Sequence, residues 1–496
     1  MRSSSDARFT WRAIAAAAAL LIIPAISWAG CHVVTKSGSG NSTGTDWNNA
    51  CADFSGACSP SSLVRGDTYY VAAGSMYSPS NFDAPDSGTS VITVKAPSAG
   101  DHCSDAGWNG SLEGTAVFKG GVQFESDYWV FNGVHRDPGM RSGYGFKIEN
   151  NNGSNAPYNM VALGAGLDST HSPNHVTVKY VELAGSSDVS DTYFDRGIWF
   201  STTGEQGEPG NYIGYSWIHD TGNCPILVDG QIGVMVEHNW IQNNQSQGSN
   251  NHSEGIAVRL SGTIPSTNAV IRYNYLENIM GTGFIATPSS NSASFDQKNF
   301  YIYGNTFFFN AADRNPRAAA DQQVSNGIAI SIFQTEVSGT LYVANNTFIN
   351  VGNAAAGGST GVGYSQPISV GTVEYFNNLW FKSNSVGDAC LSGVVATCEE
   401  NSNAAFQTPS NFADDPNVQV SGATILPNYA SNDFTPAMDT DSGSNQSAVF
   451  SLDADGNAYG SDGGIWTRGA IQFMGTSSPQ PPVPPTDISI TIETTP

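Results

Sequence analysis

A short pattern of alternating apolar residues around an asparagine recurs through the middle of the chain and constrains the fold more than any other feature. Its copies lie at 213–218, 236–241, 271–276 (IRYNYL), 302–307, 343–348 and 375–380. The shared asparagine falls at 239, 274, 305, 346 and 378, so these copies are 31 to 41 residues apart. A second short apolar stretch lies between them, at 197–200, 225–228, 255–258, 283–286 and 327–330. Each repeat therefore holds two or three short strands joined by Asn, Gly and Ser turns.

A unit of this length cannot enclose a hydrophobic core alone, so successive units must stack into a solenoid. No long helical pattern intervenes, which argues against a βαβ fold, and the uneven spacing argues against a propeller. Stacking places equivalent residues about 4.8 Å apart, so we expect the asparagines to form a ladder of side-chain amides. The sequence predicts an all-β protein with the architecture of a parallel β-helix.

Composition narrows the function classes. Only 12% of the residues are charged, against about 25% in an average protein, and the formal net charge is -24. Asn, Ser, Thr and Gly must therefore supply most of the polar surface, which excludes a helical protein covered in charges. The 39% of hydrophobic residues can form a core and exclude a disordered chain. The acidic balance repels phosphate backbones, so nucleic acid is excluded as a partner.

Both ends of the chain differ from the repeats. Residues 1–29 combine three arginines, an apolar run of about 14 residues and small residues before Ala29, which indicates a secretory signal peptide and not a transmembrane helix of roughly 20. We expect export, with lipid attachment at Cys31 as the alternative to simple secretion. Residues 30–475 are predicted to form one monomeric β-helix domain, with a first coil at about 31–75 and insertions and loops at about 184–194, 242–251 and 386–430. Residues 476–496 form a Pro-rich tail.

Seven cysteines remain after the signal peptide. In an exported chain they are expected to form disulfides. Cys51 with Cys58, and Cys390 with Cys398, are close enough in sequence to form local loop disulfides. The odd count leaves one thiol over, and no Cys/His spacing indicates a zinc site.

Stacking also allows residues to be compared in columns across the short strands. One column is predicted to contain Ser201, Asp229, Arg259, Thr287 and Ser331, and a second on the same face to contain Trp199, Leu227, Ala257, Ile285 and Ala329. This face gathers charge in a chain that has little of it. The catalytic candidates are Arg259, Glu254, Asp229 and His252, and the substrate-binding candidates are Trp199 and Arg196.

An aromatic face beside forked hydrogen-bond donors suits a sugar ring with hydroxyl or carboxylate groups. The alternative is that Asp229 and Arg259 form an ion pair between coils with a structural role only. Two further columns are predicted to be structural. Lys179, Gly214, Glu237, Arg272 and Tyr303 would align with a Glu237–Arg272 pair, and His219, Gln242 and Glu277 would belong to the turns.

These repeats resemble the right-handed parallel β-helix, or pectate-lyase-like, superfamily over most of residues 31–474. The opening stretches at 32–47 and 66–74 and the closing stretches at 432–439 and 468–473 are similar to the first and last coils of its secreted members. The resemblance implies a right-handed solenoid. Because the superfamily includes lyases, hydrolases, epimerases and non-enzymatic surface proteins, the fold alone does not select an activity.

The stretch from Glu254 to Arg259, with Asn274 and the glycines around Thr282 one coil later, is similar to the chondroitinase B and alginate lyase group. That similarity implies Glu254 as a ligand of Ca²⁺, the one cofactor considered, and Arg259 in the position of the catalytic base. Ile256 stands where the group has a second acid.

The sequence thus predicts a secreted or cell-surface carbohydrate-active protein, whose partner is an extracellular polysaccharide and which has no transmembrane span. The first hypothesis is a polysaccharide lyase that acts on uronate-containing glycans. A non-catalytic glycan-binding or adhesion module is one alternative. A glycoside hydrolase that uses Asp229 and Glu254 as its carboxyl pair is the other.

Overall fold

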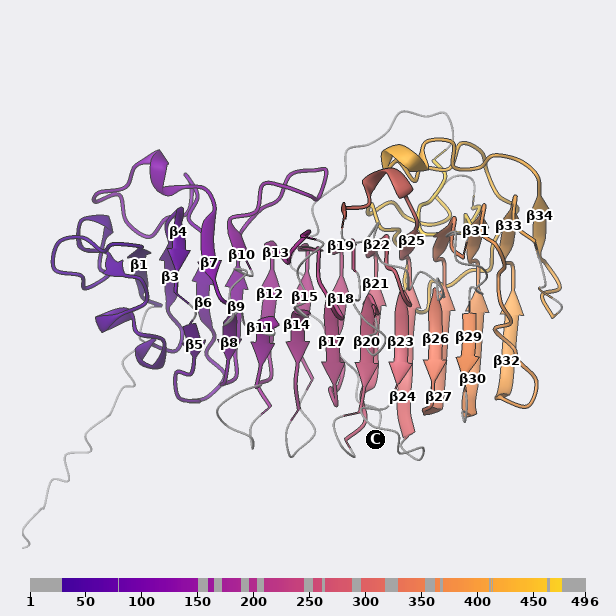
Figure 1. Ribbon diagram of the computed structural model, residues 1–496, viewed down its shortest axis with the longest axis horizontal. Coiled ribbons are helices and arrows are strands. Elements are labelled where there is room, and N and C mark those ends of the chain that lie inside the picture. Colours follow the sequence, from indigo (N-terminus) through magenta and orange to yellow (C-terminus); the bar gives the residue numbers. More distant parts are fainter. Residues whose placement is uncertain are drawn as a thin grey trace, which may run out of the picture.

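Three long parallel β-sheets run along the molecule, and the chain visits them in turn as it winds (Figure 1). The computed structural model describes residues 29–78, 80–149, 159–164, 172–188, 196–202, 209–244, 253–260, 264–287, 296–316, 329–352, 362–365, 369–409, 412, 414–461 and 464–474. Nearly all of the predicted signal peptide and the whole Pro-rich tail lie outside these residues. None of the helical segments that are described has the length and hydropathy needed to span a bilayer.

Sheet A contains the strands that lead into the asparagine of each repeat. Its 13 strands pair in the order β2-β1-β3-β6-β9-β12-β15-β18-β21-β24-β27-β30-β32. Their bounds are β1 (Cys31–Thr35), β2 (Cys51–Ala52), β3 (Thr68–Val71), β6 (Ile92–Lys95), β9 (Trp129–Asn132), β12 (Val176–Lys179), β15 (Tyr212–Gly214), β18 (Met235–Glu237), β21 (Thr267–Arg272), β24 (Asp296–Tyr303), β27 (Glu336–Ala344), β30 (Ser369–Phe376) and β32 (Val395–Asn401).

Sheet B contains the strands that directly follow the asparagine. Its 12 strands pair in the order β34-β33-β31-β28-β25-β22-β19-β16-β13-β10-β7-β4. Their bounds are β4 (Gly74–Tyr77), β7 (Ala116–Lys119), β10 (Phe146–Glu149), β13 (Val181–Ala184), β16 (Trp217–His219), β19 (Trp240–Gln242), β22 (Tyr275–Glu277), β25 (Thr306–Phe308), β28 (Thr347–Ile349), β31 (Leu379–Phe381), β33 (Ala404–Phe406) and β34 (Gln419–Ser421).

Sheet C contains the second strand pattern of each repeat. Its nine strands pair in the order β29-β26-β23-β20-β17-β14-β11-β8-β5. Their bounds are β5 (Ser80–Phe82), β8 (Val122–Phe124), β11 (Asn159–Leu163), β14 (Arg196–Phe200), β17 (Ile226–Asp229), β20 (Ile256–Arg259), β23 (Phe284–Thr287), β26 (Ile330–Phe333) and β29 (Val362–Ser365). The described 3₁₀ turns are η1 (Trp47–Asn49), η2 (Gly56–Cys58), η3 (Pro60–Ser62), η4 (Gly110–Leu112), η5 (Ala311–Asp313) and η7 (Tyr429–Ser431).

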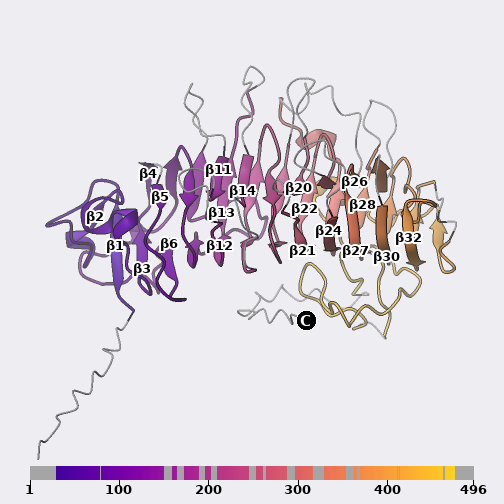
Figure 2. The same ribbon diagram turned by 90° about the horizontal axis from the view of Figure 1, so that it is seen from below.

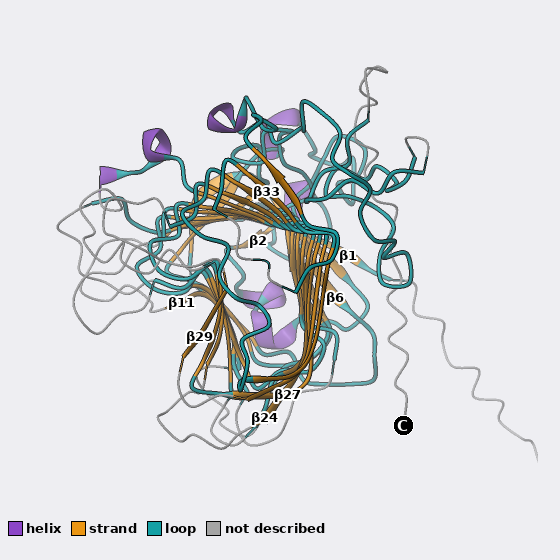
Figure 3. Ribbon diagram, turned by 90° about the vertical axis from the view of Figure 1, so that its right-hand side faces the viewer, coloured by secondary structure: helices purple, strands orange, loops and turns teal. Residues whose placement is uncertain are grey.

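The end-on view shows the strands of each sheet stacked directly over one another around a common interior (Figure 3). Side chains alternate across each strand, so every second residue faces that interior. Ile198, Ile226, Ile256 and Phe284 form one such inward row and are fully buried. The predicted all-β, right-handed parallel β-helix is confirmed, and its hand follows the strong preference for right-handed crossovers between parallel strands.

The asparagine ladder is also confirmed and continues further than the repeat pattern indicated. Nδ2 of Asn239 donates to Oδ1 of Asn274 at 3.0 Å, and equivalent bonds of 3.0–3.1 Å link the asparagines that follow. The ladder passes through Asn403 and ends on Oδ2 of Asp415, at 3.0 Å. Each amide also donates to a strand carbonyl, as Asn305 does to Ile271, so the ladder ties sheet A to the turn.

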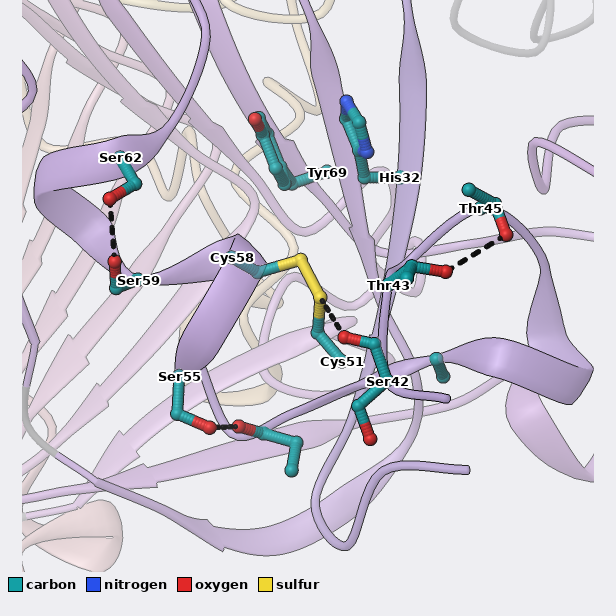
Figure 4. Close-up of a disulfide and its surroundings, with 12 residues drawn as sticks. His32, Ser42, Thr43, Thr45, Cys51, Ser55, Cys58, Ser59, Ser62 and Tyr69 are labelled. Atoms are coloured by element: carbon teal, nitrogen blue, oxygen red, sulfur yellow. Dashed lines mark hydrogen bonds between the residues drawn. A yellow bond between two sulfur atoms is a disulfide. The ribbon is translucent and has the colours of Figure 1, made fainter. Parts of the chain in front are cut away.

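Disulfides close the N-terminal end of the solenoid. Cys51 and Cys58 are joined as predicted, and Figure 4 shows their bridge beside the loop that carries Ser42 and Thr43. Gly44 follows this loop at φ 75°, where a Cβ atom would lie 2.9 Å from both sulfurs, so the position requires glycine. A further disulfide joins Cys31 to Cys103, which leaves no thiol at Cys31 for the lipid of the alternative prediction.

The second predicted pair, Cys390 with Cys398, is likewise formed. The unpaired cysteine is Cys224, which is buried.

The C-terminal part of the chain folds back along the outside of the solenoid, where Figure 2 shows it in yellow beside the sheet A strands β24, β27 and β30. It packs on outward residues of both sheet A and sheet B. Phe434 packs against Trp240, Tyr275 and Phe308, with ring centroids 4.7–6.5 Å apart. Tyr273 donates a hydrogen bond to the carbonyl of Leu452 across 179 residues of sequence. The last coils are therefore capped by the chain's own terminus.

Candidate functional site

Strands β14, β17 and β20 of sheet C position the predicted site residues. Trp199 pairs in register with Leu227, and Asp229 with Arg259, as the column comparison predicted. The inward neighbours Phe200 and Val228 are fully buried, so strand alternation turns the predicted residues to the outer face.

At the far end of these columns the prediction was wrong by two residues. Ser331 pairs with Ile285 and not with Thr287, and Ala329 precedes β26. A shift of two residues preserves the inward–outward alternation, so the run of alternating apolar residues around Ile330 fits either register. The other two columns are in the predicted register throughout: Lys179, Gly214, Glu237, Arg272 and Tyr303 in sheet A, and His219, Gln242 and Glu277 in sheet B.

Asp229 and Arg259 form a two-point ion pair between adjacent coils. Nε of Arg259 donates to Oδ1 of Asp229 at 2.8 Å, and Nη2 donates to Oδ2 at 2.9 Å. Trp199 donates its indole N–H to the same Oδ2 at 2.8 Å. The Arg196 guanidinium lies over the Trp199 ring, 5.1 Å from its centroid. Two cations, one carboxylate and one aromatic ring therefore form a continuous group.

Glu254 has a different partner. The Cys224 thiol donates to Oε2 of Glu254 at 3.3 Å, and both residues are more than nine-tenths buried. Burial, followed by the charge of Glu254, raises the pKa of Cys224 well above its usual value, so the thiol stays protonated. The sequence indicated an unpaired thiol through the odd cysteine count but did not associate it with this site.

The protonation state of Arg259 limits its chemistry. Burial alone would lower its pKa, but the hydrogen bonds and charge of Asp229 outweigh burial and raise the pKa above the usual value. A guanidinium held in this way does not accept a proton near neutral pH. It suits the binding of a carboxylate or a pair of hydroxyls through its forked N–H groups.

Access to this face is partial. Leu227, Ala257 and Ile285 lie on the outer columns and yet are at most 6% exposed. Asp229 is also enclosed, whereas the Arg259 side chain keeps 25% of its surface exposed and Trp199 is half-buried. The predicted residues thus converge on the outer face of sheet C, where Arg259 and Trp199 are partly exposed among the described residues.

His252 lies outside the described residues, as do most of the predicted loops at 184–194 and 242–251. In the described parts of the chain, no three His, Cys, Asp or Glu side chains are grouped so that they could hold a metal ion. Glu254, the predicted calcium ligand, faces the Cys224 thiol in this structure.

A second group of ionisable residues was assigned by sequence to turns. His219, Gln242 and Glu277 instead lie on strands of sheet B, where His219 pairs with Glu182 and Asp220, and Glu277 is enclosed beside Arg141. The repeats predicted the register of these residues. They did not predict their contacts with distant segments.

No family description and no curated protein matches this sequence. Among solved structures, pectate lyase Pel9A is similar with a TM-score of 0.48 and 14% identity, over 90% of this chain and 98% of that one. The complex of XylC with xylose has a TM-score of 0.42 and 10% identity, over 80% and 87%. A mutant of the PL6 family alginate lyase AlyGC has 0.40 and 11%, over 76% and 53%. At these identities the similarity concerns the fold alone.

Proposed function

We propose that the protein is a secreted carbohydrate-active protein that binds polysaccharide along the outer edge of sheet C. The observation that carries this proposal is the convergence of Trp199, Arg196 and Arg259 with the carboxylate of Asp229. An indole and two guanidinium groups provide a stacking surface and forked donors, which together suit an acidic sugar ring. Uronate-containing polysaccharide is the substrate class we propose.

In a lyase reaction a base removes the proton next to the uronate carboxylate, and cationic groups stabilise the charge that develops. Because Arg259 is held protonated by Asp229, we assign it the second role: binding and neutralising the uronate carboxylate. This differs from the role implied by the chondroitinase B and alginate lyase similarity. Non-catalytic glycan binding is the second candidate function, and it is favoured by the fact that Asp229 and Arg259 already satisfy each other.

The test uses the purified mature protein with polygalacturonate, alginate and chondroitin. The ultraviolet absorbance of unsaturated uronate ends measures elimination, and electrophoresis in gels that contain each polymer measures binding. We expect retardation by at least one uronate polymer, and loss of it in Arg259→Ala. Arg259→Lys is the matched variant, because it keeps the positive charge but loses the forked N–H donors of the guanidinium group.

Retardation together with new absorbance supports a lyase, and retardation without it supports a binding module. If no uronate polymer retards the protein, or if Arg259→Ala binds as well as the wild type, the proposed function is wrong.

A further inference from the structure

The outer face of sheet B changes character along the solenoid. From β25 to β33 the residues of one outward column are apolar and are buried under the C-terminal segment, which lies at the upper right of Figure 1. Toward the N-terminus the same face is charged. The successive residues of one column are Lys119, Glu149, Ala184, His219, Gln242, Glu277, Phe308, Ile349, Phe381 and Phe406.

We call the charged part the polar face of sheet B, and it consists of Lys119, Lys147, Glu149, Glu182, Trp217, His219 and Asp220. Its central residue is Glu182, because Oε1 accepts from Lys147 at 2.8 Å and from His219 at 3.3 Å. Lys147 also contacts Glu149 at 3.1 Å, and the other ring nitrogen of His219 contacts Asp220 at 2.7 Å. Lys119 contacts Glu149 at 3.9 Å, so one chain of ion pairs joins four coils.

The charges of the polar face balance one another. Burial opposes the charged form of His219, but its hydrogen bonds to Asp220 and Glu182 outweigh burial and raise the pKa, which favours the imidazolium. Burial likewise opposes ionisation of Glu182, yet His219 and Lys147 lower its pKa. With His219 protonated, three cations face three carboxylates. In a chain of net charge -24 this face is locally neutral.

The polar face retains hydrogen-bonding capacity and an aromatic surface. The contacts of Glu182 with His219 and Lys147 are made through Oε1. Trp217 is half-buried, stacks on His219 with centroids 3.7 Å apart, and donates to Gln242 at 3.3 Å. It is the last ring of a row with Trp240 and Tyr275, which are buried toward the C-terminal segment.

Two distant segments border the polar face. The arm after β9, residues 133–145, brings Arg141 over the Trp240 ring, and Arg141 contacts Asp313 of η5 at 3.1 Å across 172 residues of sequence. From the same segment as Asp313, Asn315 donates to Oδ1 of Asp220. The Arg141–Asp313 bridge therefore closes one end of the face, beside Glu277.

We propose that the polar face of sheet B is a second carbohydrate-binding site, and that its ligand is a neutral glycan. Sugar hydroxyls both donate and accept hydrogen bonds, so they can bond to Glu182 Oε2, to the Lys147 ammonium group and to the Glu149 carboxylate. The apolar face of the sugar ring can pack on Trp217. This face offers a uronate polymer no excess positive charge, whereas the group on sheet C holds two guanidinium groups and one carboxylate. A polycation would find no excess negative charge on this face.

The site does not depend on the proposed site on sheet C, and the test separates them. The probes are soluble β-glucan, galactomannan and arabinoxylan. Each polymer is cast into a native gel, and the migration of the mature protein through that gel is measured. We expect retardation by at least one of these neutral polymers. Trp217→Ala should weaken the apparent affinity about tenfold through lost stacking, and Glu182→Gln should weaken it through a changed hydrogen-bond pattern. Trp217→Phe keeps an aromatic face and should retain most of the binding.

The Trp199→Ala, Arg259→Ala double variant on sheet C should bind the neutral polymer as the wild type does. Circular dichroism and thermal unfolding show whether each variant is folded. If Trp217→Ala does not fold, the test rests on Glu182→Gln, which preserves the shape of the side chain. The proposal is overturned if no neutral polymer retards the wild type. It is also overturned if folded sheet B variants bind normally, or if only the sheet C variant loses binding.

Discussion

Glu277 is a carboxylic acid enclosed by protein. Its side chain is fully buried, Oε2 accepts from the Trp240 indole at 3.0 Å, and Oε1 has no hydrogen-bond partner among the described residues. Burial raises its pKa from 4.5 to about 8, so the folded protein keeps this proton at neutral pH. The unfolded chain releases it near the ordinary value.

This difference links stability to pH. Between pH 4.5 and 8 the folded state binds the Glu277 proton and the unfolded state does not, so the free energy of unfolding falls as pH rises, on the order of 4 kcal/mol in total. We expect Glu277→Gln to remove this part of the slope. Urea unfolding from pH 5 to pH 9 measures it as a wild-type minus variant difference, which cancels other raised acids such as Glu400, with a pKa of about 8. The exposed Glu113→Gln is the control, and equal slopes in wild type and Glu277→Gln would contradict the prediction.

The Asp229–Arg259 pair has a structural counterpart on sheet A. Arg272 donates to Glu237 at 2.6 Å, also between adjacent coils and also largely buried. We expect double-mutant cycles with Asp229→Asn, Arg259→Lys and with Glu237→Gln, Arg272→Lys to give similar coupling energies, about 2 kcal/mol each. Chemical denaturation measures both.

Function should distinguish the two pairs, because we place only Arg259 in a glycan site. Uronate binding should change in the first cycle and stay constant in the second. A matching loss of binding in the Glu237 and Arg272 variants would mean that binding reports general stability.

At the scale of elements, the asparagine ladder carries the connection between coils. Asn305 accepts the backbone N–H and the Nδ2 of Asn274, and it donates to Ile271 and Asn346. Asn305→Ala leaves these buried groups unpaired, so we expect a loss of about 3 kcal/mol in the free energy of unfolding. Asn417→Ala removes one exposed amide contact, to Asn401, and should be nearly neutral. Similar small losses in both variants would show that the ladder adds little.

The sequence predicted this ladder because its period and chemistry repeat in every unit. It predicted the register of the columns in sheets A and B for the same reason. The two columns in sheet C failed at Ser331 and Ala329, because a two-residue shift leaves the apolar alternation unchanged. It also brought Trp199, Asp229 and Arg259 together correctly. Whether such residues are buried depends on segments that do not repeat. Their positions could not be predicted, because they show no periodic sequence pattern.

The polar face of sheet B illustrates the same division. The alignment of His219, Gln242 and Glu277 followed from the repeats. The Arg141–Asp313 bridge beside them joins segments 172 residues apart, and no local pattern encodes it. The assignment of these residues to turn chemistry was therefore made without the distant segments that enclose Glu277, whose burial raises its pKa.

At the scale of the whole molecule, the C-terminal segment acts as the cover of the apolar half of sheet B. Phe434 is its central contact and is 6% exposed. We expect Phe434→Ala to reduce the free energy of unfolding by about 3 kcal/mol and to increase binding of a hydrophobic dye. Val420→Ala, at a residue 61% exposed, is the control. Unchanged stability and dye binding in Phe434→Ala would show that the cover is not required.

The end of the asparagine ladder also bears on how far the stack can grow. Each asparagine donates its side-chain N–H to the side-chain oxygen of the asparagine on the next coil toward the C-terminus. A further coil would therefore have to accept one such bond and donate another. Asp415 accepts from Asn403 but, as a carboxylate, has no N–H to offer. An asparagine on a further coil would therefore receive no hydrogen bond from this position. The row begins at Asn239, whose Oδ1 already accepts from the backbone N–H of Ser216, and it ends at Asp415, so a single carboxylate fixes the length of the row.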